Sequence, residues 1–386
     1  MKKTLKFIAY PLALLLLLMG ILHVIWLVQP KHTLNLYIQD KSVTALDRPE
    51  HKSLVWILNH KRITKPNEKM YSNTKDYFGF HPIDIEDNTF NLRNIRINEI
   101  DSFAKYYDVA YLTDCYGVHS FEWYKGKTQP IRSQKVYGGL NQNDYLFIKS
   151  MLEKGKLVIG EYNMLNAPTN ALVRTKTESL LNITWHGWTG KYFSTLNTNR
   201  SNGPAEWIKN LYESQHFNEW PANKGGIIIL SNDGQIELLA KDEHLNTCLP
   251  TIETEHNIAS QLGVNSKVPF DHWFEFISAG SNSIVANLNI DVNEKGLAKL
   301  KKLGLTPFTP AVIKGSEGNN FYYFCGDFAD NPASLWTAKL WGGQWLNKMI
   351  YYKKNYARMK FFNDFYAPLI EGILFEQAIS HNYSSE

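Results

Sequence analysis

The sequence predicts an α/β protein in which helices flank a mostly parallel sheet, with an added β-hairpin, a helical C-terminal extension and one preceding transmembrane helix. Three observations support this fold class: an uncharged apolar run near the N-terminus, alternating strand and helix patterns in the middle of the chain, and aromatic-rich helical patterns near its end. The expected parts are a cytoplasmic stub and transmembrane anchor over residues 1–30, an extracytoplasmic α/β domain over 31–332 and the helical extension over 333–386.

Residues 7–28 are expected to form the membrane-spanning helix. The run has 22 residues without a formal charge, and at about 1.5 Å per residue it crosses a hydrocarbon core of about 30 Å. Lys2, Lys3 and Lys6 precede it, which places the N-terminus in the cytoplasm under the positive-inside rule. We therefore expect the run to contact the lipid bilayer of an inner or cytoplasmic membrane in a single pass, with the remaining chain extracytoplasmic.

A cleaved signal peptide is the alternative interpretation of this run. The apolar region of a signal peptide is usually about 7–15 residues long and ends at an Ala-x-Ala-like site. Here the run is longer, and residues 28–32 (VQPKH) form no such site. We therefore favour an uncleaved anchor.

The charge balance argues against one class of partner. The 386 residues include 41 Lys and Arg and 37 Asp and Glu, and three of the lysines precede the apolar run. Beyond residue 30, 38 basic residues therefore stand against 37 acidic ones. A nucleic-acid-binding domain normally carries a basic excess, so we expect no nucleic-acid partner. Three cysteines are too few for a disulfide framework.

The first elements after the anchor are a strand and a helix. Residues 34–39 alternate apolar and polar side chains, as a half-buried strand does. Asp47-Arg48-Pro49-Glu50 then predicts a helix start, with Asp47 as the N-cap and a proline in the first turn.

A βαβ unit is predicted between residues 107 and 162. Residues 107–114 form an apolar strand pattern, residues 141–155 place apolar side chains at helical spacing after a polar start, and residues 156–162 form the next strand pattern. Strand, helix and strand with short joints favour a right-handed crossover in a parallel sheet.

The second half of the chain predicts further strands and then helices. Residues 226–239 hold two apolar runs around Asn232-Asp233-Gly234, a strong β-hairpin signal. Further expected elements are strands at 273–277, 284–290, 311–313 and 321–324, a helix at 293–303, and a mostly helical tail over 336–378.

The segment from Tyr107 to Asn166 resembles the class I glutamine amidotransferase-like fold. In that family a strand of the type yDvvllxxg is followed by a helix and then by xGkxvlGxCxG. Residues 107–112 (YDVAYL) match the first motif, and residues 153–163 (EKGKLVIGEYN) match the second. The resemblance implies an α/β fold over about residues 33–330, with a ligand-binding position beyond the strands.

The resemblance breaks at the nucleophile. The cysteine of active members would fall at Tyr162, two residues after Gly160, and the second glycine of the turn would fall near Met164. A phenol cannot perform thiolate acyl transfer, so we expect a degenerate member without glutaminase activity.

Candidate site residues follow from the strand ends, because ligands of open parallel sheets bind beyond the carboxyl ends of the strands. Asp114 and Glu161 end neighbouring strands, and two carboxylates facing one cleft can share general acid and base chemistry. The alternative is that both cap loops and helices. The other candidates for ligand binding at these ends are Asp40, Lys41, Tyr116, Tyr162, Asn163 and Asp327.

Trp185, Trp188 and Thr189 add a second candidate group. They belong to the sequence Trp185-His186-Gly187-Trp188-Thr189-Gly190, which we expect to form a loop. Sugars stack on indole faces through their C–H surfaces, and the indole N–H is an additional donor. The alternative is that these tryptophans fill the core.

No motif indicates a metal or cofactor. HExxH, GxSxG, GxGxxG and the P-loop are absent. Residues 327–332 (DFADNP) offer oxygen atoms, but an Asn-Pro turn accounts for them equally well. We expect no cofactor and no metal.

These observations favour a membrane-anchored extracytoplasmic protein without glutaminase activity that binds a glycan or a partner protein in cell-envelope or surface-polymer handling, and they favour binding over catalysis. A glycoside- or ester-type hydrolase using Asp114 and Glu161 is the first alternative. A structural subunit of a membrane complex, with the tail helices as its interface, is the second.

Overall fold

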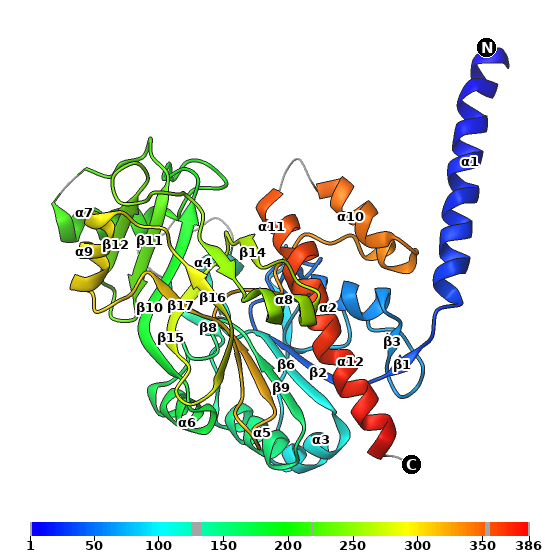
Figure 1. Cartoon of the computed structure of the whole chain (residues 1–386), viewed down its shortest axis with the longest axis horizontal. Coiled ribbons are helices and arrows are strands. Elements are labelled where there is room, and N and C mark those ends of the chain that lie inside the picture. The colour runs from blue at the N-terminus through cyan, green and yellow to red at the C-terminus, as the bar shows by residue number, and fades with distance from the viewer. Residues whose placement is uncertain (1, 125–132, 218, 352–355, 385–386) are drawn as a thin grey trace.

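The computed structural model describes residues 2–124, 133–217, 219–351 and 356–384. They form an α/β body with one ten-stranded sheet and one four-stranded sheet, and a long N-terminal helix projects from it (Figure 1). Two groups of helices flank the large sheet: α3, α5 and α6 pack together, and α12 packs against α2 and α8. The bounds of these helices are α2 (Pro49–His60), α3 (Ile100–Tyr106), α5 (Gln142–Glu153), α6 (Ala171–Leu181), α8 (His256–Leu262) and α12 (Ala367–Ser384).

The large sheet is mixed, so the prediction of a mostly parallel sheet is wrong. Five neighbouring strands run parallel, and the strands outside them pair antiparallel. Six residues separate β17 from β18, a connection too short for a parallel crossover. In spatial order the strands are β14 (Lys267–Pro269), β13 (Thr251–Glu253), β16 (Ser283–Asn289), β17 (Phe308–Lys314), β18 (Phe321–Phe324), β9 (Leu157–Gly160), β6 (Val109–Asp114), β2 (Leu36–Asp40), β4 (Phe78–Asp84) and β5 (Thr89–Arg93), with β18 to β4 parallel.

The predicted βαβ unit is confirmed. Strands β6 and β9 are parallel neighbours, and α5 lies between them in the chain. The prediction of short joints is wrong for the first joint, because residues 115–141, 27 residues, separate β6 from α5. The side chain of Asn141 caps α5 by accepting hydrogen bonds from the backbone N–H groups of Asn143 and Asp144. Helix α2 also forms, but its N-cap is Arg48 in a left-handed conformation with φ of 50°, so Asp47 is not the cap that the sequence predicted.

The second sheet is antiparallel throughout, and it contains the predicted hairpin of β11 and β12. The segment expected as a tryptophan-rich loop is part of strand β10 instead. Gly187, with φ of 81°, provides a bulge between Trp185 and Thr189 that keeps both halves of the strand paired with β15. The strands in order are β12 (Ile236–Ala240), β11 (Gly226–Ser231), β10 (Thr184–Phe193) and β15 (Phe274–Ser278).

Short elements complete the chain. Two small two-stranded sheets pair β1 with β3 and β7 with β8. Their bounds, with those of the remaining helices, are β1 (His32–Thr33), β3 (Ile63–Thr64), β7 (Val118–His119), β8 (Lys135–Tyr137), η1 (Ile97–Glu99), α4 (Ser120–Trp123), α7 (Glu206–His216), α9 (Glu294–Lys302), η2 (Leu335–Lys339), α10 (Gly343–Tyr351), α11 (Tyr356–Phe361) and the π-helical turn η3 (Phe362–Tyr366).

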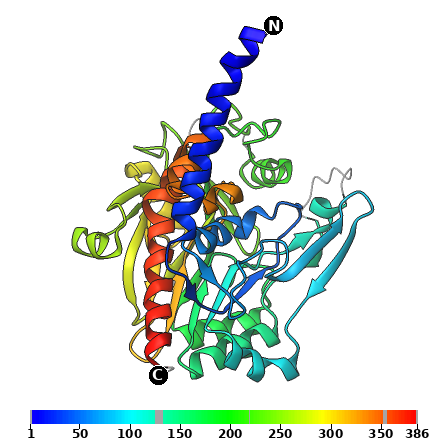
Figure 2. The same cartoon turned by 90° about the vertical axis from the view of Figure 1, so that its right-hand side faces the viewer.

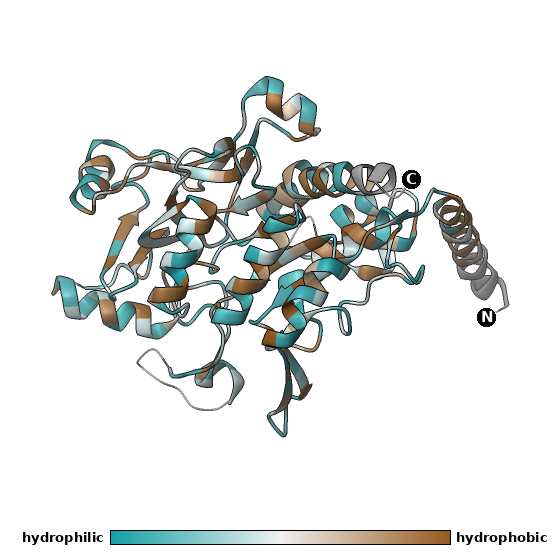
Figure 3. Ribbon diagram, turned by 90° about the horizontal axis from the view of Figure 1, so that it is seen from below, coloured by the Kyte–Doolittle hydropathy of each residue, from teal (hydrophilic) through white to brown (hydrophobic). Residues whose placement is uncertain are grey.

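Helix α1 (Lys2–Leu27) projects from the body (Figure 2), and the part of it that is coloured by hydropathy in Figure 3 is predominantly apolar. Its segment Tyr10–Leu27 is long and apolar enough to span a membrane, and no other helix in the described ranges is. The C-terminal end of α1 is bonded to the body. Trp26, 5% exposed, donates from Nε1 to the His60 carbonyl, and the Trp341 N–H donates to the Leu22 carbonyl.

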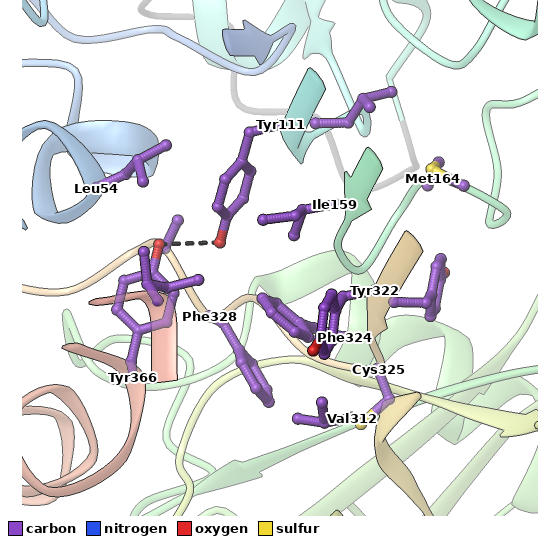
Figure 4. Close-up of a cluster of buried hydrophobic side chains, with 14 of the residues drawn as sticks. Leu54, Tyr111, Ile159, Met164, Val312, Tyr322, Phe324, Cys325, Phe328 and Tyr366 are labelled. Atoms are coloured by element: carbon purple, nitrogen blue, oxygen red, sulfur yellow. Dashed lines mark hydrogen bonds between the residues drawn. The ribbon is translucent and has the colours of Figure 1, made fainter. Parts of the chain in front are cut away.

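The C-terminal helices pack into the main core. Tyr366 is buried against the parallel strands, where its hydroxyl lies 3.0 Å from that of Tyr111 on β6 (Figure 4). Phe361 and Phe365 stack on each other and meet Phe328 edge to face. The predicted helical extension therefore forms, and it shares the hydrophobic core of the α/β body.

Candidate functional site

A cavity of about 520 Å³ lies at the carboxyl ends of the parallel strands. The segments after β2, β6, β9 and β18 border one side, and β10, the turn after β11 and the start of α7 border the other. This is where an open parallel sheet normally places its ligand, because the strand ends diverge into loops there.

The structure brings six of the predicted site residues together in this cavity. They comprise two carboxylates, two tyrosines, one asparagine and one threonine. The six residues are Asp114, Tyr116, Tyr162, Asn163, Thr189 and Asp327.

Asp114 is the central carboxylate of this group. Its Oδ1 accepts hydrogen bonds from the Tyr116 backbone N–H at 2.7 Å and from Asn163 Nδ2 at 3.4 Å. Burial, and then the charge of Asp40, raises the pKa of Asp114 to about 7. An acid that keeps its proton near neutral pH can donate it to a bound ligand.

Glu161 does not line the cavity. Its side chain is fully buried in the core, whereas its neighbour Tyr162 lines the cavity. The Tyr111 hydroxyl donates to Oε1 at 2.5 Å, and the backbone N–H groups of Phe328 and Ala329 donate to Oε2 at 2.8 and 3.0 Å. Burial raises the pKa of Glu161 well above its usual value. These contacts join β6, β9 and the loop after β18, and they do not bring Glu161 to Asp114.

Asp40 and Lys41 do not line the cavity, and both residues are almost completely buried. Asp40 Oδ2 is 2.5 Å from His51 Nδ1, and its Oδ1 accepts from the Ser42 N–H. Lys41 donates to Asp144 and to the Gly139 carbonyl. Both side chains hold the loop after β2 in place, and their neighbour Ser42 lines the cavity instead.

Trp185 and Trp188 also lie outside the cavity. Trp185 is 7% exposed and donates from Nε1 to the Trp188 carbonyl across the bulge, and Trp188 packs against the main core. Only Thr189 of this segment reaches the cavity.

The sequence reasoning missed several cavity residues. Lys191 and Phe193 follow the predicted Thr189 at alternate positions along β10 and line the cavity with it, so a strand interpretation of this segment would have identified Lys191. Trp207 and Trp273 contribute aromatic surface from α7 and from the residue before β15. Their isolated positions in the sequence carried no recognisable signal.

Several ionisable side chains that line the cavity have shifted pKa values. Burial and then Arg358 lower the pKa of Lys191, whose Nζ lies 5.6 Å from the centre of the Trp273 ring. Glu50 lines the cavity with an unpartnered buried Oε2, and burial and then Asp40 raise its pKa well above the usual value. Burial, followed by the nearby charge of Asp330, also raises the pKa of Asp327 well above its usual value.

Among the described residues, one group has metal-ligand spacing: the ligand-type atoms of His272, Asp327 and Asp330 lie within 4.8 Å of one another. Asp327 and Asp330 line the cavity, and His272 is buried behind them.

Comparison with known proteins gives little further information. No protein-family model and no curated protein matches the chain. Among solved structures, the chain is similar to a putative ThuA-like protein from Bacteroides uniformis, with a TM-score of 0.39 and 8% sequence identity over 92% of this chain and 93% of that one. A likeness at this level assigns no function.

Proposed function

We propose that the chain is a membrane-anchored extracytoplasmic protein whose cavity binds a glycan of the cell envelope or of a surface polymer. The observation that carries this proposal is the lining of the cavity. Aromatic faces from Trp207, Trp273 and Tyr116 stand beside hydrogen-bonding groups such as Asp114 and Asn163. This combination suits a sugar, which presents apolar C–H faces and a ring of hydroxyls.

The way α1 joins the body supports a permanent anchor rather than a removed signal. Trp26, Leu22 and His23 in its last turns bond to the backbone of the body. Cleavage of a signal peptide would remove these contacts from the mature protein. The three N-terminal lysines then favour a cytoplasmic N-terminus and an extracytoplasmic body.

Exposed apolar side chains beside the end of α1 support the same arrangement. Trp336, Trp341 and Trp345 are 53%, 56% and 64% exposed, and Met349 is also exposed. The Trp341 N–H is bonded to the Leu22 carbonyl, and η2, which contains Trp336, contacts α1, so these two tryptophans stand next to the apolar helix. Tryptophan is enriched at membrane–water interfaces, so the body would rest on the outer surface of the bilayer.

The amidotransferase-like interpretation remains part of the proposal. It is supported by the adjacent parallel strands β18, β9, β6 and β2 and by the position of Tyr162 just after β9, at the cavity. A phenol at this position agrees with binding without glutamine hydrolysis.

Glycan binding by the full-length chain in lipid nanodiscs tests the proposal. A glycan array is screened, and the strongest saccharide is titrated by tryptophan fluorescence. We expect Trp207→Ala to weaken binding at least tenfold because it removes a stacking face, whereas Trp188→Phe, outside the cavity, leaves binding unchanged. Absence of any saccharide binding by the folded protein would overturn the proposal.

A carboxylate-dependent hydrolase is the second candidate, favoured by the pKa of about 7 at Asp114. A carboxylic acid with this pKa is suited to protonating a leaving group. Glu50 and Asp327 border the same cavity and could act as the second carboxylate in place of Glu161. Assays with p-nitrophenyl glycosides and esters test this candidate: it requires turnover that Asp114→Asn abolishes, and it fails if no substrate is turned over.

A further inference from the structure

Three side chains from two separate segments meet at one wall of the cavity. His272 precedes β15, and Asp327 and Asp330 lie in the loop after β18. One imidazole nitrogen and one oxygen from each carboxylate lie within 4.8 Å of one another. Ligand atoms of a tetrahedral site with bonds of about 2.1 Å stand about 3.4 Å apart, so modest side-chain rotation would bring the three around one ion.

His272 is the observation that points to a ligand. The residue is 1% exposed, and neither of its ring nitrogens has a hydrogen-bond partner among the described residues. The nearest carboxylate oxygen, Oδ1 of Asp271, is 3.7 Å from Nε2, which is beyond hydrogen-bond distance. Leaving a buried polar group unpaired costs about 1–3 kcal/mol, and such groups usually have a function or an unseen partner.

The rings of Phe270 and Phe361 restrict the orientation of this imidazole. Their centroids lie 5.2 and 5.8 Å from that of His272. The two phenylalanine rings also contact each other, with centroids 5.0 Å apart, and neither offers the imidazole a hydrogen bond. An ion held between His272, Asp327 and Asp330 would give the imidazole a partner.

The carboxylate of Asp327, which lines the cavity, is the second feature of this group. Within the described ranges, no hydrogen bond or ion pair reaches its side chain, and Asp330 stands close enough for their charges to repel. Arg358 pairs with Oδ2 of Asp330 at 3.0 Å, and within the described ranges no hydrogen bond or ion pair reaches Oδ1 of that residue. A cation between Asp327 and Asp330 would remove the repulsion.

We propose that His272, Asp327 and Asp330 form a binding site for a divalent transition-metal ion, Zn²⁺ or Mn²⁺, that opens into the cavity. One nitrogen and two carboxylate oxygens suit such an ion better than Ca²⁺ or Mg²⁺, which prefer oxygen ligands alone. Three protein ligands leave a coordination position free for water or a ligand on the cavity side. This site differs from the expectation of no metal, and it does not depend on the identity of the cavity ligand.

Metal binding to the full-length chain in detergent, after treatment with a chelator, tests the proposal. Calorimetric titration with Zn²⁺ and Mn²⁺ should give one site per chain, with Mg²⁺ and Ca²⁺ at least tenfold weaker. Asp327→Asn and His272→Gln should each weaken Zn²⁺ binding at least tenfold. His256→Gln, which changes an exposed histidine on α8, should leave the affinity unchanged.

Thermal unfolding separates metal binding from folding. Asp327→Asn preserves the shape of the side chain and removes the charge that repels Asp330, so the metal-free variant should be at least as stable as the wild type. Zn²⁺ should raise the melting temperature of the wild type but not of this variant. The proposal is overturned if no one-to-one binding occurs, or if Asp327→Asn retains the wild-type affinity and thermal shift.

Discussion

Lys41 Nζ and Asp144 Oδ2 form an ion pair at 2.5 Å beneath the cavity, with side chains only 1% and 3% exposed. Asp144 also accepts hydrogen bonds from Gln39 and from the Asn141 backbone N–H. One carboxylate thus connects the end of β2 to the start of α5. Lys41 precedes the cavity residue Ser42 in the chain, and its backbone N–H donates to the carbonyl of the cavity residue Asp114 at 2.8 Å.

Removing Asp144 should therefore be costly. Asp144→Ala leaves the Lys41 ammonium buried without its partner, and we expect a loss of about 3–5 kcal/mol in the free energy of unfolding. Urea denaturation of the detergent-solubilised chain measures the loss. The paired replacement Lys41→Met with Asp144→Leu should lose less than the single variant. A loss below about 1 kcal/mol for Asp144→Ala would show that the pair is not buried as described.

Asp114 should make stability depend on pH. Because its pKa of about 7 in the folded state lies above that of the unfolded chain, folding binds a proton between about pH 4 and pH 7. Stability contributed by this group should therefore fall as pH rises through that window. At about 1.4 kcal/mol per pKa unit, the upper limit of the effect is about 4 kcal/mol.

Asp114→Asn removes this titration while keeping an oxygen for the Tyr116 N–H. The variant should gain stability relative to the wild type at pH 8 and show little difference at pH 4. Denaturation midpoints of both proteins between pH 4 and pH 8 measure this. Parallel pH profiles for the two proteins would contradict the raised pKa.

Glu161→Gln should destabilise the fold. The carboxyl group accepts hydrogen bonds from the Tyr111 hydroxyl and from two backbone N–H groups, and the amide of glutamine would turn a donor toward one of them. We expect a loss of about 1–3 kcal/mol, measured by urea denaturation. Saccharide binding by the folded variant should persist, because the side chain does not reach the cavity. An unchanged stability together with lost binding would instead place Glu161 in the site.

The exposed tryptophans beside α1 should contact lipid. In liposomes that contain brominated lipids, the fluorescence of the full-length chain should be partly quenched, and Trp341→Phe should reduce the quenched fraction. Trp188→Phe is the matched control, since Trp188 packs against the core of the body. Equal quenching in both variants would show that Trp341 does not face the bilayer.

The sequence allowed the local elements to be predicted better than their assembly. Apolar patterns located β6, α5 and β9 because each buries one face or is buried entirely. Strand direction at the sheet edges depends on long-range pairing, so the antiparallel strands β13, β14, β16 and β17 were not foreseen as part of one mixed sheet. The bulge at Gly187 likewise interrupts the regular strand pattern of β10, so this segment was predicted as a loop.

The candidate site was predictable where it follows strand ends. Asp114 and Tyr162 were located by the rule that ligands bind beyond parallel strands. The same rule selected Glu161 and Lys41, but a strand end does not tell which neighbouring side chain turns toward the core. Only the folded chain brings Trp207 to the cavity lining and His272 to its place behind Asp327 and Asp330.

The crystal structure of the chain with its strongest-binding saccharide tests the central claim most directly. The account predicts that the sugar lies in the cavity, with a hydroxyl within hydrogen-bond distance of the Asp114 carboxyl group and a C–H face on the ring of Trp207. A saccharide bound elsewhere on the body, with the cavity free of sugar, would contradict it.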